Sequence, residues 1–70
     1  MKNNIKKIRE KNEISLIRFH KELLLKNVEC SEMTLRNWEA NAYQPKTLVL
    51  QVMAHVLGCD YEDLISENKS

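Results

Sequence analysis

The sequence predicts an all-α protein, because three observations favour helices over sheets. Only one glycine and one proline occur in 70 residues, and β-branched residues form no long runs, so the signals of strands and tight turns are missing. Apolar residues make up 43% and charged residues 30% of the chain, a balance typical of a folded globular protein. The length allows one small domain over residues 1–70 and excludes two.

The first two helices are expected over residues 4–11 and 16–26. Isoleucines three residues apart among charged neighbours predict that the first is short and amphipathic. Ser15 is a suitable N-cap for the second helix, which should end in a turn near Asn27. Its buried stripe is expected to comprise Leu16, Phe19 and Leu23, with Leu24 as a further candidate.

A third helix is expected after Ser31, which is the next N-cap candidate. Apolar residues at spacings of three and four define its inward face, namely Leu35, Trp38 and Ala42. The outward face then consists of Glu32, Met33, Arg36, Asn37 and Ala40. Residues 41–45 should form a loop, because a proline at 45 disfavours helix in the residue before it.

Thr47 opens the fourth expected helix, and Gly58 lies just past its end as the C′ residue. The apolar stripe of this helix consists of Leu50, Met53, Ala54 and Leu57. Asp60 should cap a short fifth helix, with Asp63 in the capping-box position three residues later. The core therefore covers about residues 4–65, and residues 67–70 are expected to fray.

Charge is divided unevenly along the chain. Residues 1–27 hold eight basic and three acidic side chains, for a net charge of +5, whereas residues 28–70 hold three and seven, for −4. A basic half is compatible with a surface that faces phosphates. No apolar run is long enough to span a bilayer, and no secretion signal follows the first lysines, so we expect a cytoplasmic protein without a membrane partner.

The elements carry an ordered set of motifs: Ser31-x-x-Thr34-Leu35-x-x-Trp38-Glu39-Ala40-Asn41, then Pro45, then Ala54-x-x-Leu57-Gly58 and Glu62-Asp63-Leu64. Together they resemble the Cro/C1-type (XRE family) helix-turn-helix DNA-binding domain over nearly the whole chain. The resemblance implies a compact five-helix bundle of the lambda repressor-like fold. It also implies a small transcriptional regulator of phage, mobile-element or bacterial origin, and a structural ion pair between Arg9 and Glu39.

The chain departs from the family pattern between Ser15 and Ser31, where it is several residues longer. Either the second helix is extended or the turn before the third helix is a longer loop. An alternative register starts the second helix at His20, but it loses Ser15 as the N-cap. We therefore prefer the first register.

In a helix-turn-helix the outward residues of the second motif helix read base edges in the major groove. The base-contacting candidates are Glu32, Met33, Arg36 and Asn37. Asparagine pairs with adenine, arginine with guanine, and glutamate with the amino group of cytosine. Glu32 and Arg36 are also spaced as an ordinary solvated ion pair.

Contacts to the DNA backbone would come from hydroxyl, amide and basic side chains flanking this helix. The candidates are Ser31, Thr34, Tyr43, Gln44, Lys46, Lys21 and Arg18. So few cations predict weak binding by a monomer, and we expect a homodimer on a two-fold operator. The dimer surface is expected on the last two helices, unless their extra apolar residues complete the core; these are Val49, Val52, Val56, Tyr61 and Ile65.

Two other classes of function were weighed. An enzyme is disfavoured, because the chain has two histidines, no glycine-rich loop and no paired-carboxylate motif. His55 and Cys59 are four residues apart, but no further ligand lies near them, so neither metal nor cofactor is expected. The stronger alternative is a protein-interaction module that binds a partner such as a toxin or an antirepressor and has little affinity for DNA.

Overall fold

Five helices joined by short turns make up residues 2–65, which are the residues that the computed structural model describes. They are α1 (Ile5–Lys11), α2 (Leu16–Leu25), α3 (Glu32–Glu39), α4 (Thr47–Leu57) and α5 (Tyr61–Ile65). No strand occurs in this range, so the all-α prediction is confirmed for it. The expected fraying of residues 67–70 concerns residues outside the described range.

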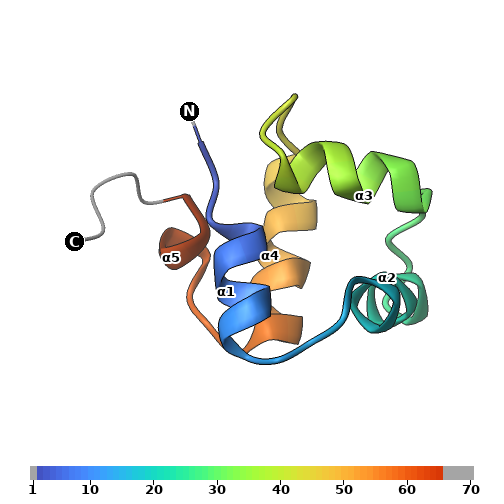
Figure 1. Cartoon of the computed structure of the whole chain (residues 1–70), viewed down its shortest axis with the longest axis horizontal. Coiled ribbons are helices and arrows are strands. Elements are labelled where there is room, and N and C mark those ends of the chain that lie inside the picture. The colour runs from blue at the N-terminus through green and yellow to red at the C-terminus, as the bar shows by residue number, and fades with distance from the viewer. Residues whose placement is uncertain (1, 66–70) are drawn as a thin grey trace.

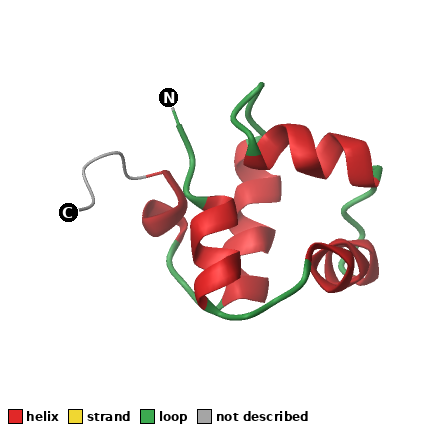
Figure 2. Ribbon diagram, viewed as in Figure 1, coloured by secondary structure: helices red, strands yellow, loops and turns green. Residues whose placement is uncertain are grey.

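Helix α4 lies at the centre of the bundle and packs against α1, α2 and α5 (Figure 1). Helix α3 packs against α1 and α2 at one end of the molecule (Figure 2). In Figure 1, α2 is seen end-on while α3 lies in the plane of the view, so these consecutive helices cross. The two helices form the right-hand side of the molecule in that view.

The core is built from the predicted inward positions of all five helices. Fully buried apolar side chains are Ile5, Phe19, Leu23, Leu35, Leu50, Met53 and Leu64. Leu24 does not belong to this core, because it is 44% exposed on the opposite side of α2. The apolar residues expected to form a dimer surface are half-buried and pack against the core cluster; they are Val49, Val52, Val56, Tyr61 and Ile65.

The predicted N-caps Ser15 and Ser31 are confirmed, and at α5 the Asp60 backbone N–H donates to Asp63 Oδ2 (3.2 Å), as the capping-box position predicts. Ser15 Oγ accepts a hydrogen bond from the Arg18 backbone N–H (3.1 Å), and Ser31 Oγ accepts one from Thr34 (3.0 Å). Each serine satisfies a helix N–H that has no partner within the helix. Because α2 begins directly after Ser15, the alternative register that starts this helix at His20 is wrong.

The same backbone motif ends α1, α2, α3 and α4. A residue with left-handed backbone follows each helix, and the next residue donates its N–H to the carbonyl five positions earlier, which is the Schellman motif. The left-handed residues are Glu13, Asn27, Asn41 and Gly58, with φ of 58°, 69°, 64° and 72°. The prediction of Gly58 as the C′ residue of the fourth helix is confirmed.

The prediction for Ala42 is wrong because this motif ends the helix before it. We expected Ala42 on the inward face of the third helix, but α3 ends at Glu39 and Ala42 is exposed in the following turn. Its backbone N–H donates to the Asn37 carbonyl (3.0 Å) across the left-handed Asn41. The helical spacing of Ala42 is therefore a coincidence of sequence beyond the end of the helix.

The extra length between the two serine caps is divided between helix and loop. Helix α2 has ten residues, and residues 26–31 connect it to α3. Val28 is buried within this connection, and Nε2 of His20 hydrogen-bonds the Cys30 carbonyl at 2.6 Å. The longer connection is thus fixed to the body of the bundle and to α2 itself.

Helix α3 is fixed to α1 by the ion pair that the resemblance implies. Nε and Nη2 of Arg9 donate to the two carboxylate oxygens of Glu39 at 2.7 and 3.1 Å. Nη1 of Arg9 also donates to the Ile14 carbonyl (2.7 Å) in the turn before α2. Because both charged side chains are nearly buried, this bidentate ion pair sets the position of α3 relative to α1.

The residues before α1 connect it to two other parts of the molecule. Asn3 Nδ2 donates to the Trp38 carbonyl and to Gln44 Oε1, both at 2.8 Å, and its backbone N–H donates to Asn41 Oδ1 (2.7 Å). Asn4 donates from its backbone N–H to the Leu64 carbonyl (2.7 Å) and from Nδ2 to the Asp63 carbonyl (3.0 Å). We call residues 3 and 4 the N-terminal clasp, because they join the α3–α4 loop to α5.

Candidate nucleic-acid interface

Helix α3 presents one face to solvent while its other face is held by the bundle. Leu35 on the inner face is fully buried in the core. Glu39 on the same face is bound by Arg9 of α1. Residues on the opposite side of a helix then point outward at the helical spacing. Of the four predicted base-contacting residues, Met33 (67% exposed) and Arg36 are exposed, whereas Glu32 and Asn37 are half-buried.

Glu32 and Arg36 interact with each other on this face. Nη2 of Arg36 donates to Oε2 of Glu32 at 2.9 Å, and their side chains remain 61% and 45% exposed, respectively. An exposed pair of this kind stabilises a helix by only about 0.3–0.5 kcal/mol. The solvated pair anticipated from the spacing is therefore present, and it is weak enough to open when a stronger partner for Arg36 arrives.

Asn37 adjoins the loop that follows α3. Its Nδ2 lies 3.5 Å from the Tyr43 hydroxyl, at the outer limit of a hydrogen bond, and Tyr43 is 49% exposed. The structure therefore brings a predicted base-contacting residue and a predicted backbone-contacting residue together. An amide and a hydroxyl are available side by side at the C-terminal end of α3.

Gln44, another predicted backbone contact, serves a structural role. Its Oε1 accepts from Asn3 Nδ2 (2.8 Å), and its Nε2 donates to Asn41 Oδ1 (3.1 Å). Both polar atoms of the side chain therefore have partners beneath the loop. Asn3 and Asn41, which the sequence interpretation did not include among the site residues, hold this loop beside α3.

The hydroxyl groups at the start of α3 are also engaged with each other. Ser31 Oγ donates to Thr34 Oγ1 at 3.0 Å while it caps the backbone N–H of Thr34. Ser31 is exposed and Thr34 is half-buried at the N-terminal end of α3. The positive end of a helix dipole and polar hydroxyls here suit an anionic group.

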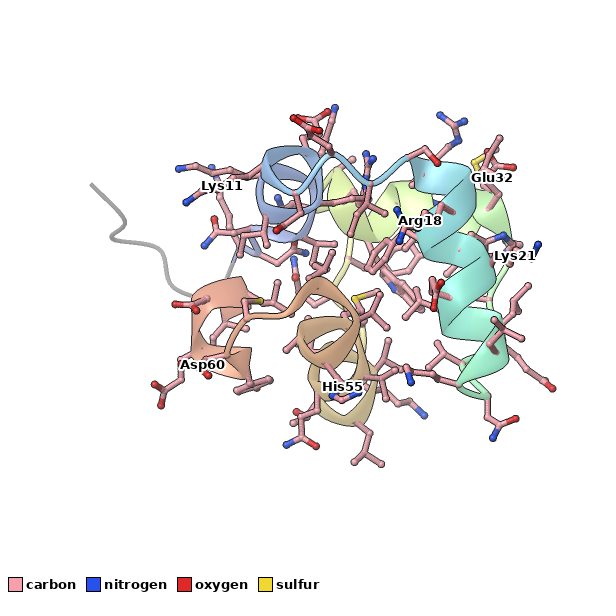
Figure 3. All side chains as sticks on the ribbon, turned by 90° about the horizontal axis from the view of Figure 1, so that it is seen from below. Lys11, Arg18, Lys21, Glu32, His55 and Asp60 are labelled. Atoms are coloured by element: carbon pink, nitrogen blue, oxygen red, sulfur yellow. The ribbon has the colours of Figure 1, made fainter. Side chains whose placement is uncertain are left out.

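The three predicted basic contacts lie in different places. Lys46 precedes α4 beside a hollow of about 430 Å³ that Trp38 and Val52 help to line. Lys21 lies on the solvent side of α2 (Figure 3). Arg18 lines a hollow of about 230 Å³ between α2 and α4 together with His55. Residues two apart on an α-helix point in nearly opposite directions. Because His20 points towards the loop before α3, Arg18 points away from that loop and from the outer face of α3.

The cysteine thiols are separate from this surface. Burial raises the pKa of Cys30, and burial together with the carboxylates of Asp63 and Asp60 raises the pKa of Cys59. Both side chains are therefore neutral thiols at neutral pH. In the described part of the chain, no three histidine, cysteine or acidic side chains come together as metal ligands.

Comparison of the sequence with protein-family models and with curated proteins finds no match. Within residues 2–65, no helix combines the length and the apolar character needed to cross a membrane. The chain is thus defined by its own geometry as a small all-helical globule with five helices in the described range. The argument for its function depends on the surface around α3.

Proposed function

We propose that this chain binds double-stranded DNA sequence-specifically and acts as a small helix-turn-helix transcriptional regulator, with repression as its action. One observation carries the proposal. A short, serine-capped helix crosses the helix before it, has its inner face fixed by Leu35 and Glu39, and presents polar side chains to solvent. A rigid helix of this kind fits the major groove, which admits one α-helix.

The outer side chains of α3 match base edges chemically. Asn37 suits the paired donor and acceptor of adenine, and Arg36 suits the two acceptors of guanine. Met33 and the methyl group of Thr34 suit the thymine methyl group, whereas Glu32 accepts from the cytosine amino group. Phosphate contacts would come from Ser31 and Thr34 at the start of α3, Tyr43 in the loop after it, Lys46 before α4 and Lys21 on α2.

With few cations, a monomer should bind DNA weakly. Self-association through α4 would raise the affinity for DNA. No acidic or basic side chain other than His55 occurs between Thr47 and Leu57, and Leu48 is 74% exposed. A two-fold axis brings each residue near its own copy, so an uncharged apolar surface suits self-association. The homodimer would present two α3 helices to half-sites about one helical turn apart.

Selection from a random duplex library tests the proposal directly. We expect an enriched two-fold site, which the variant Arg36→Ala/Asn37→Ala should bind at least about 100-fold more weakly, since each bidentate base contact contributes roughly 1–3 kcal/mol. The control Lys7→Ala/Asn12→Ala removes one cation and one amide from α1 and from the residue that follows it, outside α3 and α4. It should retain the selected sequence preference and most of the affinity.

Failure of the selection would have a specific meaning. If no sequence is enriched and no duplex binds even at low salt, the DNA-binding proposal is wrong. The protein-interaction module would then be the better reading, because α2 exposes Ile17 and Leu25 (both 71%) where a phosphate-facing helix needs polar groups. Equal losses in the α3 variant and the control would instead exclude α3 as the reading helix.

Glu32→Gln is expected to increase duplex affinity about fivefold, because it removes a negative charge near the phosphates and releases Arg36 from its ion pair. The slope of log affinity against log salt should steepen, because the net positive charge that faces the phosphates rises by one. Titrations at several salt concentrations measure both. Glu62→Gln on α5 is the control, and an equal increase there would assign the effect to net charge alone.

A further inference from the structure

Helix α2 has a second apolar face that the bundle does not use. Its inner face contributes Phe19 and Leu23, both fully buried. Its outer side carries Ile17, Leu24 and Leu25, which are 71%, 44% and 71% exposed. These are three of the six large hydrophobic side chains that are exposed within residues 2–65, so exposed apolar surface is concentrated on one ten-residue helix.

The outer residues of α2 form a continuous stripe. Ile17 and Leu24 are seven residues apart, with Lys21 between them at helical spacing, and Leu25 lies beside them. We call Ile17, Lys21, Leu24 and Leu25 the α2 stripe. In Figure 1, α2 and α3 together form the right-hand side of the molecule, and in Figure 3 α2 lies at the right with Lys21 labelled on it. Single exposed apolar residues are common, but a contiguous apolar face indicates an interaction surface.

The stripe itself carries one charge, which is positive. Lys21 lies within the stripe, whereas Arg18, Glu22 and Lys26 line the hollow of about 230 Å³ that His55 also lines. The ion pairs of Arg9 with Glu39 and of Arg36 with Glu32 do not include Lys21. Lys21 is exposed and therefore available to a carboxylate of another molecule.

This charge decides what can cover the stripe. A second copy placed on a two-fold axis would bring Lys21 close to its own counterpart, which is unfavourable, whereas the surface of α4 around Leu48 avoids this repulsion. A phosphate backbone would be drawn to Lys21 but would gain nothing from Ile17 and Leu25. An apolar surface with acidic borders satisfies both components of the stripe.

We propose that the α2 stripe docks an amphipathic helix of another protein whose apolar face is bordered by aspartate and glutamate. Apolar side chains of that helix cover Ile17, Leu24 and Leu25, and its carboxylates pair with Lys21. A consequence rests on the proposed function: a helix on α2 occupies the side from which DNA must approach Lys21. Docking of the partner and binding of the duplex then exclude each other, so an acidic helical partner would release the regulator from DNA.

The probe is a fluorescently labelled peptide of about 18 residues, long enough to form a helix, with leucines on one face and glutamates on its borders. Fluorescence anisotropy should detect binding of this peptide to the wild-type chain. A peptide of the same composition with scrambled leucine positions should bind at least about tenfold more weakly, because it has no continuous apolar face. A peptide with lysine in place of glutamate should also bind more weakly.

Variants of the chain locate the binding surface. Ile17→Gln/Leu25→Gln should weaken binding of the acidic peptide at least about tenfold, since both apolar contacts are lost. Leu48→Gln is the matched control, because it removes an equally exposed apolar side chain from α4, and it should leave peptide affinity unchanged. Lys21→Glu should weaken the acidic peptide and strengthen the basic one. All these positions are exposed, and far-UV circular dichroism would check that each variant folds.

Equal binding of the scrambled peptide, no binding of the acidic peptide, or an equal loss in Leu48→Gln would overturn the proposal. A second arm adds a labelled duplex obtained from the library selection. Displacement of the duplex by the acidic peptide supports mutual exclusion, and a ternary complex overturns it. Peptide binding without any duplex binding would refute the proposed DNA function while supporting the docking surface.

Discussion

Glu39→Ala is expected to lower the free energy of unfolding by about 3–5 kcal/mol, because it removes one partner of a buried ion pair. Nε and Nη2 of Arg9 would lose their acceptors, and only the Ile14 carbonyl at 2.7 Å would remain. The Arg9 side chain is 10% exposed, so water has little access to replace the carboxylate. A domain of 70 residues has about 4–10 kcal/mol of stability in total. The variant should therefore be largely unfolded at moderate temperature.

Urea denaturation followed by circular dichroism measures this loss, and the chain offers a matched control. Glu32→Ala removes the same side chain from an exposed ion pair on the same helix, and it should cost less than about 1 kcal/mol. Replacing both Arg9 and Glu39 with methionine should recover much of the stability, since no charge is then left buried. If Glu39→Ala costs no more than Glu32→Ala, this pair does not anchor α3.

Asn3→Ala is expected to destabilise the domain by about 2–4 kcal/mol, because one side chain satisfies three separate groups. It donates to the Trp38 carbonyl and to Gln44 Oε1, and its Oδ1 accepts from the Ile5 backbone N–H (3.1 Å). Asn3 is only 6% exposed. These partners would be left unsatisfied where water reaches them poorly.

Asn12→Ala is the control for Asn3→Ala, because Asn12 makes a single exposed hydrogen bond to the Ile8 carbonyl. It should change the free energy of unfolding by less than about 1 kcal/mol. Amide hydrogen exchange adds a local measurement, since Asn3→Ala should speed exchange of the backbone amides of residues 41–44 more than those of α4. Similar exchange in that loop before and after the substitution would show that Asn3 does not hold it.

The helices were predictable because their signals are local. The side chains of Ser15 and Ser31 each cap the backbone N–H of the residue three positions later. The buried residues of α4 recur at helical spacing. The extent of α3 was less predictable. Ala42 fits the apolar spacing, and only the left-handed Asn41 ends the helix before it.

Long-range contacts carry much weaker sequence signals. The bonds of Asn3 join residues more than 30 positions apart, and an asparagine near a helix start reads equally well as a simple cap. Arg18 illustrates the same limit, since the sequence places it on α2 but does not show that it faces α4. The ion pair of Arg9 and Glu39 was accessible only through the family resemblance, which supplied the spatial pairing.

The candidate interface was predictable in its composition and less so in its organisation. The outward positions of α3 follow from helical spacing once Leu35 is placed inside, and they hold the expected side chains. The hydrogen bonds of Gln44 with Asn3 and Asn41 depend on how the fold brings residue 3 beside the α3–α4 loop. Ile17 and Leu25 were predictable as outward residues of α2, but the extent of their exposure, 71% for each, was not.

The N-terminal clasp also orders events while the protein is being synthesised. Asn3 leaves the ribosome before its partners Trp38, Asn41 and Gln44, which follow 35 to 41 residues later. The Asp63 carbonyl, which accepts from Asn4, follows 59 residues later. Until α5 has emerged, Asn4 at the start of α1 lacks its acceptors Asp63 and Leu64. The N-terminal clasp is therefore translated well before the residues that complete its contacts.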